Sequence, residues 1–183
     1  MALDLSYAPI DADTVTRGFC CGERELDRFF ARDALAAHQR GTILTTCAYL
    51  PGIAAPVGFY SITTVAEEVA NLPASYHRFG KGEHYPALQL VYLAVHRPHQ
   101  DRDIGISMAG AVIELFADVG QRISIPHLIL VPINEDVISF YEEQLGFTCY
   151  KDRSRMYLPL QDAVEAAATP AAEATGDLFE PNA

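Results

Sequence analysis

The chain has 183 residues, half of them hydrophobic, and a formal net charge of −11. A chain of about this length buries roughly 70% of its unfolded surface, so one domain is expected to be stable without disulfides or structural metals. The charge excludes a protein that binds nucleic acid through a general excess of basic residues, and leaves only a local basic face possible.

The first half of the chain is predicted to be a helix between strands, because its apolar residues alternate, then recur at helical spacing, then alternate again. The expected elements are a strand at 3–10, a helix at 23–40 and strands at 42–50 and 57–64. Residues 71–86 are rich in Pro, Gly and basic side chains, which predicts a long connection where substrate is touched.

The second half alternates strands with helices, beginning with the nearly unbroken apolar run of a central strand. The expected elements are strands at 88–96, 128–131 and 156–160, a further strand opening at Phe147, and helices at 104–122 and 136–145. This order requires a central mixed β-sheet with helices on both faces, so the fold class is α/β.

The end of the chain differs in composition from the rest. Residues 161–183 are dominated by Ala, Glu, Thr and Pro and contain five acidic residues but no Lys or Arg. Such a segment buries too little apolar surface to offset its chain entropy. We therefore predict a domain at 1–160 and an acidic, disordered tail at 161–183.

The sequence lacks the patterns that indicate a membrane span, secretion, a disulfide framework or a metal site. No run approaches the roughly 18 apolar residues of a membrane span, and the N-terminus has no secretory pattern. The four cysteines fit neither a metal spacing nor a disulfide framework, and His96 and His99 have no further ligand cluster nearby. We expect a cytoplasmic protein with reduced thiols, no metal and no membrane association.

The stretch VPINEDVISFYEEQLGF at 131–147 carries Asn134, Tyr141 and a Gly146-Phe147 turn behind an apolar strand. It resembles the C-terminal half of the GNAT acyltransferases, in which Asn and Tyr seven residues apart face the thioester of acetyl-CoA. The resemblance implies the GNAT fold and an N-acetyltransferase with acetyl-CoA as acyl donor. It implies that Tyr141 protonates the departing thiolate and that Asn134 holds the pantetheine arm or the tyrosine. The alternative for Tyr141 is a core aromatic residue.

A cradle for the CoA pyrophosphate is expected between the central strand and the next helix, where free N–H groups and the helix dipole favour phosphate. This loop, QDRDIG, comprises Gln100, Asp101, Arg102, Asp103, Ile104 and Gly105. Gln100 and Gly105 match the GNAT pattern, whereas Asp103 stands where its first Gly is expected. A carboxylate there repels pyrophosphate, and a side chain hinders close backbone approach. The alternative is an ordinary capping loop with Asp103 as N-cap.

The resemblance also assigns the group that meets the thioester oxygen. It implies a backbone N–H of Leu93, Ala94 or Val95, at the splay of the central strand, as a fixed electrostatic donor. A general base is not identifiable, because residues 88–96 include no Glu or Asp. The amine then loses its proton to water or arrives already neutral.

The segment FCCGERELDRFF at 19–30 resembles the opening of the GNAT toxins of toxin-antitoxin pairs. The likeness continues at 58–61, 72–73, 93–95 and 139–142. Members of that group acetylate the α-amine of aminoacyl-tRNA and block translation, pair with a ribbon-helix-helix antitoxin, and often form dimers. The resemblance therefore implies aminoacyl-tRNA and such an antitoxin as partners, and a homodimer.

A local basic face is available for tRNA despite the acidic balance. Arg24, Arg28 and Arg32 fall at i, i+4 and i+8 of the predicted helix. Four further candidates are Arg78, Lys81, Arg153 and Arg155. The alternative is a solvated face in which Glu25, Asp27 and Asp33 neutralise the stripe.

Three hypotheses follow from these patterns. The first is a toxin-type acetyltransferase of charged tRNA. The second is the same chemistry on a small amine or a protein N-terminus, since an acidic surface suits cationic acceptors. The third is a non-catalytic binding module whose cradle, altered by Asp103, no longer holds CoA.

Overall fold

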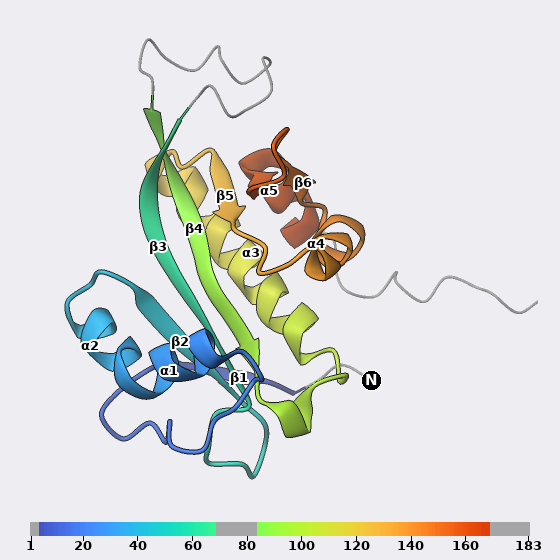
Figure 1. Cartoon of the computed structure of the whole chain (residues 1–183). Coiled ribbons are helices and arrows are strands. Elements are labelled where there is room, and N and C mark those ends of the chain that lie inside the picture. The colour runs from blue at the N-terminus through green and yellow to red at the C-terminus, as the bar shows by residue number, and fades with distance from the viewer. Residues whose placement is uncertain (1–3, 69–83, 169–183) are drawn as a thin grey trace, which may run out of the picture.

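The structure is a computed structural model that describes residues 4–68 and 84–168. Its centre is a seven-stranded sheet in the order β1-β2-β3-β4-β5-β7-β6 (Figure 1). The strands are β1 (Ser6–Pro9), β2 (Leu44–Tyr49), β3 (Gly58–Glu68), β4 (His84–Val95), β5 (His127–Leu130), β6 (Thr148–Cys149) and β7 (Met156–Pro159). Only β4 and β5 pair in parallel, which confirms the predicted mixed sheet.

Helices cover both faces of the sheet, as predicted. They are α1 (Arg24–Arg32), α2 (Ala34–Gln39), α3 (Ile104–Ile123), α4 (Asp136–Leu145) and α5 (Leu160–Ala168), with a 3₁₀ turn η3 (Arg97–His99) after β4. Successive side chains of a strand point to opposite faces of the sheet, so neighbouring residues of β2 and β3 belong to different hydrophobic cores. Cys47 and Phe59 pack with α1 and α2, whereas their neighbours Ala48 and Tyr60 belong to the larger core beneath α3, α4 and α5.

The α1 face is filled mainly by aromatic rings. Phe30 stacks on Phe59 with ring centroids 4.2 Å apart, and Phe29 lies 4.4 Å from Tyr92. Phe29, Phe30 and Ala34 are all buried, so the predicted amphipathic stripe is real. The chain nevertheless forms two helices rather than one at 23–40, because Asp33, at φ −113°, interrupts the helix.

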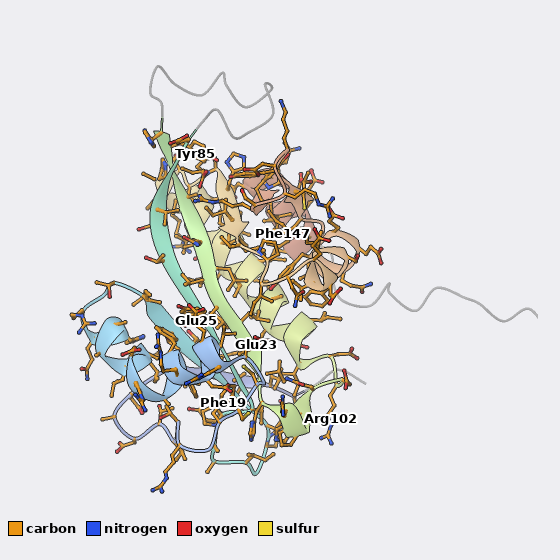
Figure 2. The ribbon with its side chains drawn as sticks, in the orientation of Figure 1. Phe19, Glu23, Glu25, Tyr85, Arg102 and Phe147 are labelled. Carbon is orange, nitrogen blue, oxygen red and sulfur yellow. The ribbon has the colours of Figure 1, made fainter. Side chains whose placement is uncertain are left out.

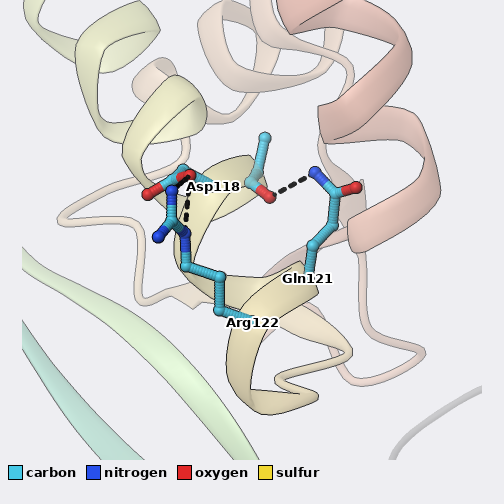
Figure 3. A network of polar contacts seen from close by, with 4 residues as sticks. Asp118, Gln121 and Arg122 are labelled. Atoms are coloured by element: carbon cyan, nitrogen blue, oxygen red, sulfur yellow. Dashed lines mark hydrogen bonds and ion pairs between the residues drawn. The ribbon is translucent and has the colours of Figure 1, made fainter.

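Helix α3 has the length and a mean hydropathy of 1.3 that would allow a membrane span, but 44% of that stretch is buried inside the protein. Met108 and Phe116 are fully enclosed. The last turns carry a solvent-exposed ion pair, Arg122 to Asp118 at 2.7 Å, and Gln121 donates to the Ala117 carbonyl (Figure 3). The helix is therefore a core element of the domain with one solvent-exposed face.

The prediction of disorder from Gln161 onward is wrong for residues 161–168, which lie in α5. This helix packs on α3: Ala163 is fully buried, and a Cβ placed on Gly120 would come within 2.6 Å of Leu160 Cδ1. A small residue on each helix permits the close approach. Residues 169–183 lie outside the described chain, so the tail and the domain boundary stay predictions there.

The hairpin of β3 and β4 is longer than predicted. β3 extends to Glu68, and β4 begins at His84, so residues 84–86 belong to a strand and not to the expected connection. Residues 69–83, which include the candidates Arg78 and Lys81 and the Leu72-Pro73 match, lie outside the described residues.

The sheet opens between its two parallel strands. β4 pairs with β5 only from Ala87 to Leu90, and then runs on to Val95 without that neighbour. The register of β3 against β4 shifts between Ser61 and Ile62, which leaves Val91 as the extra residue of a bulge. The bulge bends β4 where it leaves β5, and a cleft forms there.

Candidate active site

A cleft of about 550 Å³ occupies the splay between β4 and β5. Its walls come from β4, from the chain after β5, from α4 and from the start of α1. The lining residues are Leu90 to Val95, Leu130 to Ile133, Val137, Phe140, Tyr141, Gln100, Cys21, Glu23, Glu25 and Leu26. The structure thus brings Tyr141 to the same cleft as Leu93, Ala94 and Val95, the grouping that the sequence predicted.

Tyr141 packs in the core and also lines the cleft, so its position fits both interpretations weighed from the sequence, and its role as an acid stays a prediction. Its ring lies 5.1 Å from Phe140 and 5.6 Å from Phe147, edge to face. Gly146, at φ 71°, ends α4 as predicted and turns Phe147 back under the tyrosine. Burial raises the pKa of Tyr141 to about 12. The hydroxyl therefore stays protonated at neutral pH and can donate a proton to a departing group.

Asn134 does not line the cleft. The side chain is exposed, and its Oδ1 accepts a hydrogen bond from the Val137 N–H at 3.2 Å, at the start of α4. This contact fixes the first turn of the helix that carries Tyr141. Contact of Asn134 with a pantetheine arm stays a prediction.

The stretch at 100–105 follows η3 and includes the first two residues of α3, so its backbone lies at the N-terminus of a 20-residue helix. The Gln100 side chain is exposed but bonded to the backbone: its Nε2 donates to the Cys21 carbonyl at 2.8 Å and to the Val95 carbonyl at 3.0 Å. The Ile104 side chain is buried in the core, so only its backbone is available to a ligand. Arg102 is exposed at the end of the molecule (Figure 2).

Asp103 lies in a backbone conformation that glycine adopts readily. Its φ is 58°, and Asp101 has a φ of 59°, both in the left-handed region that Asp tolerates better than most residues. Asp103 is the N-cap of α3, as the alternative interpretation held, but its side chain makes no capping hydrogen bond. A Cβ on Gly105 would touch only Val95, at 3.8 Å, so protein packing does not require that glycine.

The start of α1 is the part of the site that the sequence analysis missed. Glu23, Glu25 and Leu26 line the cleft although they lie about sixty residues before β4 in the chain. Figure 2 shows both carboxylate side chains projecting from this segment over the sheet. A partial signal existed, since the family likeness at 19–30 covers these residues, but no local pattern linked them to β4.

Hydrogen bonds hold the segment before α1 against the end of β4. The Cys20 carbonyl accepts the Arg97 N–H at 2.8 Å, and Asp27 Oδ1 accepts the Cys21 N–H at 2.7 Å. Burial raises the pKa of the Cys21 thiol to about 11, so this cysteine is not a nucleophile at neutral pH. His96, one of the two histidines considered as ligands, hydrogen-bonds Cys20 through Nδ1.

The three arginines of the predicted stripe are exposed on α1. The ion pairs found within the described residues are Arg122 with Asp118 and Arg155 with Glu67, so no acid neutralises the stripe by direct contact there. Asp27 is engaged with the Cys21 N–H instead. Arg155, proposed from the sequence as a further tRNA contact, instead pairs with the buried Glu67, whereas Arg153 is exposed.

No cluster of three or more His, Cys, Asp or Glu suited to a metal occurs in 4–68 or 84–168.

Known proteins match this fold and sequence. A family model described as "Acetyltransferase (GNAT) family" matches residues 14–147. The tRNA-acetylating toxin of Mycobacterium tuberculosis (strain ATCC 25618 / H37Rv) is 28% identical over 131 residues, which cover 72% of this chain and 76% of that protein.

Two solved structures illustrate the likeness in fold. AtaT complexed with acetyl-methionyl-tRNAfMet has a TM-score of 0.79 and 21% identity, covering 86% of this chain and 96% of that one. A mutant of the AtaT toxin bound to acetyl-CoA and the C-terminus of the antitoxin AtaR has a TM-score of 0.72 and 20% identity, covering 87% and 96%. Together with the family match, these similarities confirm the predicted fold.

Proposed function

The chain belongs to the acetyltransferase (GNAT) family, and we propose that it transfers the acetyl group of acetyl-CoA to the α-amine of an aminoacyl-tRNA. One observation carries the proposal: a single cleft is lined by Tyr141, by the length of β4 that has no β5 neighbour and by the start of the arginine-bearing helix α1. The acyl donor, the acid that protonates its leaving group and a surface for tRNA phosphates then meet in this cleft.

The donor is proposed to enter from the α3 side. Its pyrophosphate lies on the backbone N–H groups of Asp101 to Gly105, at the positive end of the α3 dipole. The pantetheine arm then follows β4 at Leu93 to Val95, which has no β5 neighbour there. A backbone N–H of this stretch meets the thioester oxygen and stabilises the charge that develops on it. The acetyl-CoA named in the AtaT structure supports this donor.

The chemistry is direct acyl transfer. The amine nitrogen attacks the thioester carbonyl, the C–N bond forms and the C–S bond breaks. Tyr141 gives its hydroxyl proton to the departing sulfur and recovers one from solvent. Its raised pKa keeps that proton available throughout the neutral range.

The acceptor is proposed to be charged tRNA because the relatives named for it share the fold and because α1 offers unpaired cations. Arg24, Arg28 and Arg32 are exposed on the helix that begins at the cleft. Guanidinium groups at this spacing can neutralise successive phosphates of an acceptor stem. The name of the M. tuberculosis relative and the tRNA in the AtaT complex support this substrate.

The regulation proposed here also follows the relatives. The AtaR segment in the AtaT structure supports an antitoxin as a partner of this chain. We extend this to an antitoxin with a ribbon-helix-helix domain, to a homodimer and to action in the cytoplasm. Size measurement of the purified protein with and without a co-expressed antitoxin tests the assembly.

The test of function compares acceptors. Initial rates of acetyl transfer are measured with methionyl-tRNA, uncharged tRNA, a polyamine and a short peptide, at increasing salt. We expect transfer to methionyl-tRNA alone, with log(kcat/KM) falling linearly with log salt concentration. Salt-insensitive transfer to the polyamine or the peptide would instead establish the second hypothesis.

Donor binding is tested separately by thermal unfolding with acetyl-CoA. Ligand at 100 times its dissociation constant adds about 2.7 kcal/mol of stability, which gives a clear upward shift in Tm. No shift at millimolar acetyl-CoA would favour the non-catalytic module and contradict the enzyme proposal.

A further inference from the structure

We propose that Glu23 and Glu25 recognise the acceptor: their carboxylates bind its protonated amine in the cleft, and one of them takes its proton. The inference rests on the acetyltransferase function proposed above and deepens it. It supplies the base that the sequence of β4 lacks, and it defines the substrate class as amines that arrive as ammonium ions.

The cleft has two chemically different sides, set by the alternation of β4. Leu93 and Val95 pack with the core under α3 and α4, which is also the side of Tyr141. Tyr92 and Ala94 pack with the core under α1. Because the phosphate-binding loop begins α3, the donor occupies the first side. The second side is left for the acceptor, and the lining acids of the cleft lie there.

The acidic side is held in place before any substrate binds. The Gln100 amide joins the carbonyls of Cys21 and Val95, and the Arg97 N–H donates to the Cys20 carbonyl. Phe19 stacks on His96 with centroids 5.3 Å apart. Glu23 follows this anchored segment directly, so its backbone is fixed relative to the end of β4. The backbone that carries Glu23 is thereby preorganised, and the exposed side chains of Glu23 and Glu25 are accessible to a substrate amine.

The two carboxylates have no ion-pair partner within 4.0 Å among the described residues. Burial, then the charge of Glu25, raises the pKa of the Tyr92 hydroxyl, whereas Arg28 on the next turn of α1 lowers it, so charges of both signs on α1 act on this side of the cleft. Two anions beside a largely apolar cleft attract a cation of the size of an ammonium group. Tyr92 and Leu26 supply apolar surface for the side chain that accompanies the amine.

The proton balance of the reaction is then complete. The ammonium group gives one proton to a carboxylate, and the freed lone pair forms the C–N bond with the thioester carbon. The tetrahedral intermediate loses the second N–H proton to solvent, and the C–S bond breaks with its electrons on sulfur. Sulfur takes the proton of Tyr141, and the carboxylate releases its proton to water before the next cycle.

The experiment compares Glu23→Gln, Glu25→Gln and the double variant with a control, Glu114→Gln. Glu114 is an exposed glutamate of α3 outside the cleft lining, so the control removes one charge without touching the site. The readouts are kcat/KM for methionyl-tRNA between pH 6 and 9, KM for acetyl-CoA, and the Tm shift with acetyl-CoA.

We expect the double variant to lose about 10²-fold or more in kcat/KM at neutral pH, the usual contribution of a positioned base. Its rate should then follow the free amine, rising about tenfold per pH unit below the α-amino pKa of about 7.7–8.0. The wild type should rise less steeply, and acetyl-CoA binding should be unchanged. A merely structural role would lower the rate without altering the pH profile.

The inference is overturned if the double variant keeps the wild-type rate, or if both proteins show the same steep pH profile. Failure of the proposed function is recognised separately, in the wild type. If the wild type acetylates a polyamine and not methionyl-tRNA, the same variants are compared on that amine, with the same expected results. If it acetylates no amine at all, both proposals fall.

Discussion

The two sides of the cleft differ in the groups proposed to bind their ligands: backbone N–H groups on one side and side chains on the other. On the proposed donor side, recognition is assigned to backbone N–H groups: those of the loop before α3 and those of β4 beyond Leu90, where β4 has β3 but not β5 as a neighbour. The proposed acceptor side carries Glu23 and Glu25 at the start of α1, beside the apolar surface of Tyr92 and Leu26. Recognition by backbone depends on conformation, whereas recognition by side chains depends on residue identity.

Asp103 illustrates the first half of this contrast. The loop keeps the left-handed turn at φ 58° even though a carboxylate replaces the hydrogen of glycine. Because glycine also adopts this conformation readily, we expect the carboxylate to act through its charge and through local steric access and not through a changed turn. A comparable substitution at Glu23 or Glu25 would remove the recognising group itself. Differences between acceptors are therefore expected to arise on the α1 side.

The largest effect is expected from Tyr141→Phe, which removes the acid at the junction of the two sides. We expect kcat to fall about 10²–10⁴-fold, because the thiolate then departs unprotonated. Acetyl-CoA binding and Tm should change little, since the ring and its contacts with Phe140 and Phe147 remain. Tyr150→Phe, a buried tyrosine outside the cleft lining, is the control. An unchanged turnover in Tyr141→Phe would remove the acid role.

The next effect concerns the acceptor side alone. Replacing Arg24, Arg28 and Arg32 by Gln should reduce the slope of log(kcat/KM) against log salt by about 2–3, roughly one for each lost phosphate contact. The Tm shift with acetyl-CoA should not change. Arg122→Gln, at the far end of α3, should leave the slope as in the wild type (Figure 1). An equal slope in the triple variant would show that tRNA binds elsewhere.

A third change lies outside both sides and should affect stability without catalysis. Arg155 pairs with Glu67, whose side chain is 1% exposed. Arg155→Ala leaves that carboxylate buried without this partner, so the free energy of unfolding should fall by about 1–3 kcal/mol. Arg122→Ala breaks an exposed pair and should cost about 0.5 kcal/mol or less. Urea unfolding with a constant m-value compares the two variants, and equal losses would contradict the burial argument.

The smallest effect is expected at the donor loop. Asp103→Asn removes the charge and Asp103→Gly also removes the side chain, so the pair separates repulsion from steric hindrance. A charge at a helix N-terminus is worth about 0.3–1 kcal/mol, so each variant should lower the Kd of acetyl-CoA about two- to fivefold. Calorimetric titration measures this. Weaker binding in both variants would mean that the carboxylate assists the donor loop.

The second half of the fold could be predicted from sequence because the signals for its helices and strands are local. The helix at 136–145 has the bounds that its apolar spacing and the glycine after it indicated. The bend at Asp33 had no such signal, because the buried stripe of Phe30, Ala34 and Ala37 continues across it. Periodicity reports which face is buried, not whether the axis is straight.

Helix α5 was missed for a different reason. Its sequence contains few large apolar residues, so its composition resembles that of a disordered tail. Alanine is the strongest helix former, and a helix of small side chains can dock closely where its neighbour presents Gly120. Whether such a helix finds a complementary surface depends on the folded partner, which local sequence does not reveal.

The site was predictable where its residues belong to one continuous motif. Tyr141 and the backbone at 93–95 meet in the cleft as expected, whereas Glu23 and Glu25 reach it through packing between distant segments. Asn134 shows the reverse case, since its position matches the family pattern while its side chain bonds the first turn of α4. Matching a motif locates a residue in the chain, and packing decides what its side chain contacts.

The most direct test of the account identifies the product. Methionyl-tRNA is incubated with acetyl-CoA and the purified protein, then digested, and the aminoacyl-adenosine fragment is analysed by mass spectrometry. The account predicts a gain of one acetyl group, located on the α-nitrogen, with the wild type and its near absence with Tyr141→Phe. An unmodified fragment with the wild type, under conditions where acetyl-CoA raises the Tm, would contradict the claim that this cleft joins a thioester donor to the amine of a charged tRNA.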